Sequence, residues 1–216
     1  MDYKNQEVRP LGHLHYIVKR SIDIAGGITG LIIFLPIFVI LPLFYLRGKN
    51  KGPVFFKQPR IGKNGKVFYI YKFRSMIMNA EEKLKENKIL YHKYIKNNYK
   101  LEQYEDPRVT IFGRFLRKTS LDELPQFINV LKGDMSLVGP RPVIKEELKE
   151  YGELTDKFLS VKPGLTGYWQ VSGRSDVGYP KRVHLELHYV YNQSIYFDLK
   201  ILILTIVHVL LRKGAY

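Results

Sequence analysis

The sequence predicts an α+β fold in which a re-entrant N-terminal membrane helix precedes a small, mainly helical body with a β-hairpin and interfacial helices. Three observations predict it: an uncharged apolar run at residues 24–46, a strand–turn–strand pattern at residues 55–76, and helical periodicity in much of the remaining chain. We therefore expect two units, an N-terminal membrane segment at residues 1–47 and a cytoplasmic domain at residues 48–216.

The apolar run from Ile24 to Leu46 is long enough to enter a membrane. Its 23 residues carry no charge, and as one helix they would reach about 34 Å, against a hydrocarbon core about 30 Å thick. Pro36 and Pro42 each remove a backbone donor, so we expect a kink near the middle. The run is flanked on both sides by basic residues, which are Lys19 and Arg20 before it and Arg47, Lys49 and Lys51 after it.

These basic flanks favour a re-entrant helix over a spanning one. A spanning helix would carry one basic cluster across the membrane, against the preference of Lys and Arg for the cytoplasmic side. A helix broken at Pro36 could enter and leave by the same face and keep both clusters on anionic headgroups. A kinked spanning helix stays open as the alternative, because prolines are common in membrane helices.

The charge balance points to phosphates. The chain has 35 Lys and Arg against 20 Asp and Glu, a formal net charge of +15, and no cysteine. The lack of cysteine excludes disulfides, thiolate metal sites and cysteine nucleophiles. A field this positive attracts nucleic acid, anionic lipid or a phosphorylated small molecule. Residues 47–80 hold nine Lys or Arg and no acidic residue, so a basic surface beside the membrane segment accounts for much of the excess.

The stretch after the membrane segment predicts a β-hairpin. Within residues 55–76, aromatic and β-branched residues alternate with polar ones on either side of Lys63–Asn64–Gly65, which suits a short turn. Residues 79–105 predict a surface helix or a pair of helices, to which we assign no chemistry.

The second half of the chain predicts helices separated by Gly-rich loops. Helical patterns cover residues 111–130, where Pro125 suits a first helical turn, and residues 143–160. Residues 133–142 predict a loop, and residues 162–175 a Gly-rich loop with a strand. The apolar helix expected at residues 199–211 is too short to span, so it should pack in the core or lie at the membrane interface.

Asp122 and Glu123 are the most suggestive functional pair. They follow a basic run at residues 114–118 and precede the helix expected to begin at Pro125. One carboxylate could attack phosphorus as a nucleophile, its neighbour could hold Mg²⁺, and the arginines could neutralise a diphosphate. Acidic residues also favour the first turn of any helix, and from these residues alone that plainer role is better supported.

Other motifs are weaker. Arg141 lies in the turn GPRP at residues 139–142, a place suited to gripping a phosphate, although Pro and Gly mark turns of every kind. His184 and His188 have helical spacing but no evident third ligand, so we expect them on a helix face rather than at a metal. The usual motifs of nucleotide kinases, Rossmann dehydrogenases and α/β-hydrolases are missing.

Taken together, the motifs closely resemble those of the bacterial sugar transferases, the monotopic polyprenyl-phosphate phosphoglycosyl transferases. The resemblance covers nearly the whole chain except residues 79–105. Its segments, in the expected order, are KRSIDI at 19–24, FFKQPRIGKNGKVFYIYKFRSM at 55–76, DPRVTIFGRFLRKTSLDELPQFINVLKGDMSLVGPRP at 106–142, KPGLTGYWQVSGRS at 162–175 and YNQSIYFDLKILILT at 191–205.

This resemblance implies transfer of hexose-1-phosphate from a UDP-hexose to undecaprenyl phosphate, with release of UMP, as the first step of a surface glycan. It implies a ping-pong mechanism through a phosphosugar ester on Asp122, with Glu123 assisting through Mg²⁺. It implies a helix broken at Pro36 in the bacterial cytoplasmic (inner) membrane, with the catalytic body on the cytoplasmic face. The residues to which it assigns phosphate binding are Lys72, Arg74, Arg117 and Arg141.

One residue departs from the family pattern, and two rival functions stay open. Many members have Asp where this chain has Glu186, whose longer side chain would need rearrangement to touch Mg²⁺ or an arginine. The rivals are a membrane-anchored basic module that binds lipid or nucleic acid, and a single-pass scaffold for glycan assembly. We do not expect nucleic acid as a partner, because no nucleic-acid fold motif is evident. The sequence leaves the hexose and any homo-oligomer undetermined.

Overall fold

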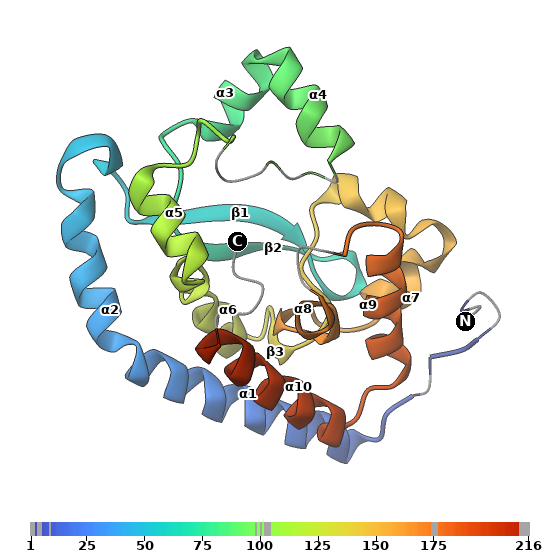
Figure 1. Cartoon of the computed structure of the whole chain (residues 1–216). Helices are drawn as coiled ribbons and strands as arrows, with labels where there is room; N and C mark the ends of the chain where they lie inside the picture. The colour runs from blue at the N-terminus through green and yellow to red at the C-terminus, as the bar shows by residue number, and fades with distance from the viewer. Residues whose placement is uncertain are drawn as a thin grey trace.

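The N-terminal apolar segment folds as two helices that meet at a bend, and the rest of the chain lies within the angle between them (Figure 1). The computed structural model describes residues 3, 6–8, 10–97, 99, 101, 105–173 and 177–211. Helix α1 spans His13–Ile33, α2 spans Leu35–Ile40, and a 3₁₀ turn, Leu41–Tyr45, completes the segment. Pro36 lies in the first turn of α2. The kink expected there is confirmed, and the two parts differ in direction by 55°.

The segment matches a membrane span only when its two parts are taken together. Within the described residues, no single helix is both long and apolar enough to cross a bilayer, whereas the bent pair meets the criterion by length and composition.

Helix α1 is held against the body by polar contacts as well as by close packing. The Arg20 guanidinium donates to the carbonyls of Val130 and Leu131 at 2.7 Å each, at the C-terminal end of α6 (Gln126–Lys132). Asp23 accepts hydrogen bonds from Ser136 Oγ and from the Leu137 amide, both at 2.8 Å. Two residues of the motif KRSID, Arg20 and Asp23, therefore attach the N-terminal apolar segment to the body by hydrogen bonds.

The hairpin forms as expected. Strands β1 (Phe55–Ile61) and β2 (Val67–Phe73) pair in antiparallel register around a turn at Lys63–Gly65, where Asn64 adopts a positive φ of 56°. A second sheet was not predicted: β3 (Ser136–Val138) and β4 (Gly164–Thr166) pair in parallel at the centre of the body.

The helices between the two sheets differ in part from prediction. The expected helical pair is confirmed as α3 (Ala80–Glu86) and α4 (Lys88–Lys96). The helical pattern expected at residues 111–130 is wrong only between α5 (Ile111–Lys118) and α6, where a 3₁₀ turn, Leu121–Glu123, intervenes. The helix expected to begin at Pro125 is confirmed as α6, which follows from Gln126.

The prediction of one helix at residues 143–160 is also wrong. This region contains the 3₁₀ helices Lys145–Glu150 and Gly152–Leu154 and the short α7, Thr155–Leu159. The interruption falls at Gly152, whose φ of 50° is incompatible with a continuous helix.

Three helices complete the chain: α8 (Tyr168–Ser172), α9 (Lys181–Tyr191) and α10 (Ile195–Leu210). Within residues 162–175, the expected strand is confirmed as β4, α8 was not predicted, and residues 174 and 175 lie outside the described part. His184 and His188 lie on α9, as expected.

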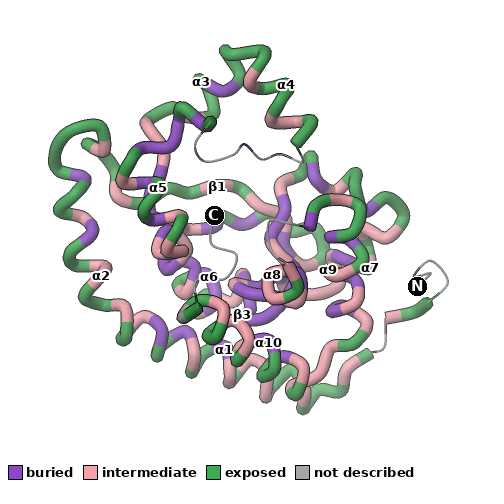
Figure 2. Tube along the Cα trace, viewed as in Figure 1, coloured by how far each residue is buried: buried purple, intermediate pink, exposed green. Residues whose placement is uncertain are grey.

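The apolar C-terminal helix, α10, begins four residues earlier than expected. Its Ile201 is fully buried, whereas Ile203 and Ile206 are 62% and 60% exposed. Figure 2 shows exposed positions along α1, α2 and α10 on the side away from the body. The packing expected for α10 is therefore confirmed for one face, and an interfacial position for the other stays a prediction.

A cluster of buried side chains joins the membrane segment to the region around Asp122. Leu41 and Tyr45 from the end of that segment contact Phe73 of the hairpin, together with Leu116 and Leu124 on either side of the 3₁₀ turn. The C-terminal end of the apolar segment thus packs against residues that flank the turn carrying Asp122 and Glu123.

Candidate active site

The two carboxylates of the Asp-Glu motif lie on the 3₁₀ turn between α5 and α6. Ser120 precedes the turn in a left-handed conformation (φ 56°, ψ 16°), which redirects the chain at the end of α5. Asp122 is only 7% exposed, whereas the side chain of Glu123 is 33% exposed. The turn therefore buries one carboxylate and leaves its neighbour partly open to solvent.

Lys72, on strand β2, lies beside this pair, and the phosphate binding expected for it stays a prediction. Its Nζ lies 2.8 Å from Glu123 Oε1, in an ion pair and hydrogen bond, and the lysine side chain is 18% exposed. Because both partners are mostly shielded from water, their attraction is screened less than that of a surface pair.

The two adjacent carboxyls have opposite pKa shifts. Burial is the largest influence on Asp122 and raises its pKa; Lys72 lowers it, Glu123 raises it again, and Arg117 and Arg141 lower it by less, so the net pKa is raised. Burial also acts to raise the pKa of Glu123, but Lys72 and Arg141 outweigh it and bring that pKa to about 2. A carboxyl that holds its proton more tightly than usual thus lies beside a permanent carboxylate.

Arg117 approaches the pair from the last turn of α5. Its Nε donates to Ser75 Oγ at 2.9 Å, and its charge lowers the pKa of Asp122. This position is compatible with the phosphate-binding role expected for it.

Arg141 approaches the pair from a different element, the loop after β3. Its backbone N–H donates to Glu186 Oε1 at 3.2 Å, and its guanidinium lies 5.6 Å over the ring of Trp169. Its charge lowers the pKa of both site carboxyls. Among the described residues, no carboxylate or carbonyl pairs with this guanidinium, so it is well placed to accept an anion.

Arg74 is positioned differently from the other three cations. Its guanidinium donates to the carbonyls of Pro53 at 2.8 Å, Met76 at 3.2 Å and Asn50. The Tyr45 hydroxyl donates to the Arg74 carbonyl at 2.6 Å. Arg74 therefore anchors the loop that follows the membrane segment, and its expected phosphate binding stays a prediction without geometric support.

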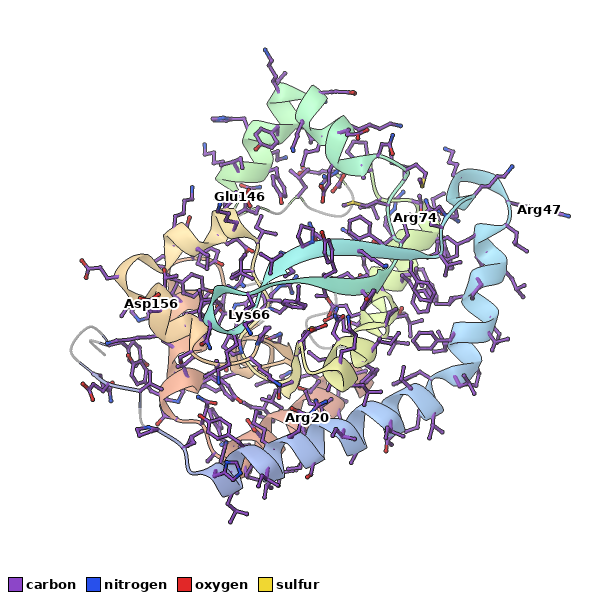
Figure 3. The ribbon with its side chains drawn as sticks, turned by 180° about the vertical axis from the view of Figure 1, so that it is seen from behind. Arg20, Arg47, Lys66, Arg74, Glu146 and Asp156 are labelled. Atoms are coloured by element: carbon purple, nitrogen blue, oxygen red, sulfur yellow. The ribbon has the colours of Figure 1, made fainter. Side chains whose placement is uncertain are left out.

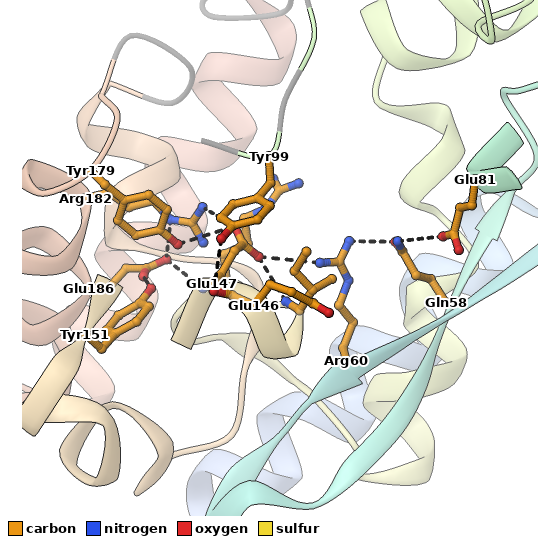
Figure 4. Close-up of polar contacts among 12 residues, drawn as sticks. Gln58, Arg60, Glu81, Tyr99, Glu146, Glu147, Tyr151, Tyr179, Arg182 and Glu186 are labelled. Atoms are coloured by element: carbon orange, nitrogen blue, oxygen red, sulfur yellow. Dashed lines mark hydrogen bonds and ion pairs between the residues drawn. The ribbon is translucent and has the colours of Figure 1, made fainter. Parts of the chain in front are cut away.

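A buried network that the sequence reasoning missed supports the Arg141 loop (Figure 4). The Arg182 Nε donates to Glu186 Oε1 at 3.2 Å, its Nη1 donates to Glu147 Oε1 at 3.3 Å, and the Tyr151 hydroxyl donates to Glu186 Oε2. Burial and the Glu186 charge raise the pKa of Tyr151 well above its usual value. Arg182 and Glu186 are four residues apart on α9, a spacing that predicts an ion pair along a helix. Nothing in the sequence around Glu147 predicts that it joins them.

The long side chain of Glu186 is accommodated within this network. With one carboxylate it accepts from a backbone amide, an arginine and a tyrosine, and it is only 1% exposed. Glu186 thus contacts an arginine, Arg182 of the same helix, and contact with Mg²⁺ stays a prediction.

The oxygen donors of the motif suit magnesium. In the part of the chain that the structure describes, no three His, Cys, Asp or Glu side chains come together as a metal site. Mg²⁺ is commonly held by one or two carboxylates, with substrate phosphates and water supplying the other ligands. The carboxylate of Glu123, which is partly exposed beside Asp122, matches that donor type.

Comparisons with known proteins agree on one family. Residues 14–212 match the family model described as bacterial sugar transferase. An undecaprenyl-phosphate galactose phosphotransferase of Salmonella typhimurium is 48% identical over 202 residues, 92% of this chain and 42% of that protein. The exopolysaccharide production protein ExoY of Sinorhizobium fredii is 43% identical over 213 residues, 97% of this chain and 91% of its own.

A third relative has a different sugar in its name. A UDP-glucose:undecaprenyl-phosphate glucose-1-phosphate transferase of Escherichia coli is 39% identical over 215 residues, 96% of this chain and 43% of that protein. The chain thus spans about two fifths of the galactose and glucose relatives, but nearly the whole length of ExoY.

Proposed function

The chain belongs to the bacterial sugar transferases, and from this premise we propose that it transfers hexose-1-phosphate from a UDP-hexose to undecaprenyl phosphate and releases UMP. The names of the Salmonella and Escherichia relatives support this reaction class. The observation that carries the proposal is the buried Asp122 carboxyl, which lies beside Glu123 and within the influence of Lys72, Arg117 and Arg141.

The proposed mechanism has two displacements at one phosphorus atom. In the first, an Asp122 carboxylate oxygen attacks the sugar-bearing phosphorus of the UDP-hexose; a new O–P bond forms and the P–O bond to UMP breaks, so UMP leaves with the electron pair. In the second, a phosphate oxygen of undecaprenyl phosphate attacks the same phosphorus. The ester bond to Asp122 breaks, the carboxylate is regenerated, and the product is a lipid diphosphohexose.

The surrounding cations explain how an anionic nucleophile can approach an anionic substrate. Lys72, Arg117 and Arg141 come from β2, α5 and the loop after β3, so they approach Asp122 from three elements. Positive charge fixed before the reaction stabilises the negative charge of a phosphoryl transition state without reorganisation of solvent. Burial of Asp122 removes the water that would otherwise compete for the ester.

We propose Mg²⁺ as the cofactor, held by the carboxylate of Glu123 together with the substrate phosphates and water. When bound, it would neutralise the diphosphate and polarise its oxygens. The low pKa of Glu123 keeps that residue ionised over the whole range in which an enzyme works. An oxygen ligand is therefore available beside the nucleophile.

We further propose that the bent segment enters and leaves the cytoplasmic membrane by the same face. The structure supports this by attaching both ends of the apolar run to one body: Arg20 and Asp23 near its beginning, and Tyr45 at its end. Arg47 projects outward just past that end (Figure 3). A straight spanning helix would separate the two ends by the thickness of the bilayer.

This attachment also weighs against the single-pass scaffold. Lys157 Nζ donates to the Tyr3 carbonyl at 2.9 Å, and Tyr191 donates to the same carbonyl at 3.1 Å. The N-terminus thus contacts the body that would have to lie across the membrane from it.

The reaction is tested by measuring UMP release from a panel of UDP-hexoses, with and without undecaprenyl phosphate. We expect stoichiometric UMP release without the lipid, because the first displacement needs no acceptor, and turnover with it. A purified, membrane-bound protein that releases no UMP from any of these donors would refute the proposal, and binding without turnover would favour the basic-module alternative.

A further inference from the structure

An apolar groove lies between the returning half of the membrane segment and α5. Its volume is about 340 Å³, and its lining includes Ile37, Ile40 and Phe44 on one side, Phe112 and Phe115 on the other, and Leu121 at one end. Every lining side chain is aliphatic or aromatic. Small-molecule sites usually measure roughly 300–1,000 Å³, so the groove has room for a short apolar segment and not for a whole lipid.

The walls of the groove are built by aromatic stacking, yet they stay accessible. The rings of Phe44 and Phe112 stack with their centroids 4.8 Å apart, which joins the membrane segment to α5. Ile40, Phe44 and Phe115 nevertheless keep about half of their surface exposed, at 53%, 52% and 52%. Such a surface is unfavourable in water and suits contact with a hydrocarbon chain.

The groove lies next to the candidate active site. Leu121 and Asp122 are neighbours on one 3₁₀ turn, and Leu121 lines the groove while Asp122 carries the proposed nucleophile. Helix α5 presents Phe112 and Phe115 to the groove and Arg117 to the carboxylates. The two regions together match a ligand that joins a phosphate directly to an apolar chain.

We propose that this groove binds the first isoprene units of the undecaprenyl phosphate acceptor. The inference rests on the proposed function, since attack on an ester at Asp122 requires the acceptor phosphate to reach that residue. The prenyl chain is bonded to the same phosphate, so its first units must lie within a few ångströms of Leu121. The groove gives them an apolar path along α2, from which the rest of the chain continues into the bilayer.

The sharpest test compares a variant that fills the groove with a variant that carries the same kind of substitution outside the groove. Ile40→Trp places a large ring in the groove, whereas Val39→Trp makes the same kind of change at the neighbouring residue of α2, which is 66% exposed and does not line the groove. Each variant is assayed in two ways, by exchange of labelled UMP into UDP-hexose, which needs no acceptor, and by transfer at varied undecaprenyl phosphate.

We expect Ile40→Trp to raise the KM for undecaprenyl phosphate about tenfold relative to Val39→Trp, equivalent to about 1.4 kcal/mol, with UMP exchange unchanged. An unchanged KM, or an equal loss of exchange and transfer, would overturn the groove assignment. If the unaltered protein shows no UMP exchange with any UDP-hexose, the proposed function fails, and that result is distinct from failure of the groove.

A second measurement does not depend on the folding of a variant. A short prenyl phosphate that carries a diazirine on its first isoprene unit is photolysed with the unaltered protein in lipid nanodiscs. We expect crosslinks within residues 37–44 and 112–121, removed by excess undecaprenyl phosphate. Crosslinks confined to other segments, or equal competition by dodecyl phosphate, would identify the groove as a site for bulk lipid and contradict the assignment.

Discussion

Lys72 Nζ lies 2.8 Å from Glu123 Oε1, and this ion pair ties the second strand of the hairpin to the turn that carries Asp122. The same lysine lowers the pKa of both carboxyls. The hairpin and the turn that carries Asp122 are distant in sequence, so this contact gives the basic hairpin a structural role at the candidate site.

Replacing Lys72 with Met should lower kcat/KM for the UDP-hexose by about 10²-fold or more, the range seen when one preorganised electrostatic partner of a transition state is removed. The measurement is the rate of UMP release at varied UDP-hexose. Lys66→Met is the matched control, because Lys66 is an exposed lysine of the same hairpin. Equal rates for the two variants would contradict the role of Lys72.

The raised pKa of Asp122 predicts an acid limb in the pH profile. The carboxyl attacks only when ionised, and burial raises its pKa above the ordinary value of 3.8. The rate of UMP exchange should therefore rise with pH through a midpoint above that value. Lys72→Met should move the midpoint higher still, since Lys72 lowers this pKa. A midpoint that stays in place in the variant would show that another group limits the rate.

Glu186 should matter both for stability and for the position of Arg141. Glu186→Gln removes the charge that faces Arg182 and replaces one acceptor oxygen with an NH₂ group, which leaves a buried donor without its acceptor. The free energy of unfolding should therefore fall by about 1–3 kcal/mol. KM for the UDP-hexose should rise as the Arg141 loop loosens. Chemical denaturation and steady-state kinetics check the two effects. Glu82→Gln, at an exposed residue of α3, should change neither.

The same-face topology predicts a labelling pattern. The chain has no cysteine, so His13→Cys and Lys49→Cys give single reporters at exposed residues on either side of the apolar segment. In spheroplasts, both should resist an impermeant maleimide added outside and react after lysis, as should Lys96→Cys on the body. Labelling of one of the first pair from outside would instead indicate a spanning helix.

The elements whose geometry depends on neighbouring residues could be predicted from the sequence. Asn64 and Gly65 favour the tight turn of the hairpin, and Pro36 breaks the membrane helix wherever the body lies. The break at Ser120 has no such signal. Long-range packing determines it: Gly113 of α5 packs against the backbone of Ser75, and Glu123 of the following turn pairs with Lys72.

Contacts between residues distant in sequence determine the positions of the other residues at the candidate site. Lys72 and Arg74 are alike in sequence context, yet one meets a carboxylate and the other is bound by carbonyls of the membrane-proximal loop. Arg182 and Glu186 could be paired from their spacing, but Glu147 joins them from a segment with no local link to α9. The motif therefore locates the candidate pair, Asp122 and Glu123, whereas the contacts that support the pair could be identified only from the fold.

The most direct test of the central claim is intact-protein mass spectrometry after brief incubation with a UDP-hexose and Mg²⁺ and without acceptor. We expect a mass increase equal to one phosphohexosyl group, which peptide analysis maps to Asp122. The adduct should be lost on addition of undecaprenyl phosphate and should never form in Asp122→Asn. An adduct on another residue, or full transfer by Asp122→Asn, would contradict the proposed mechanism.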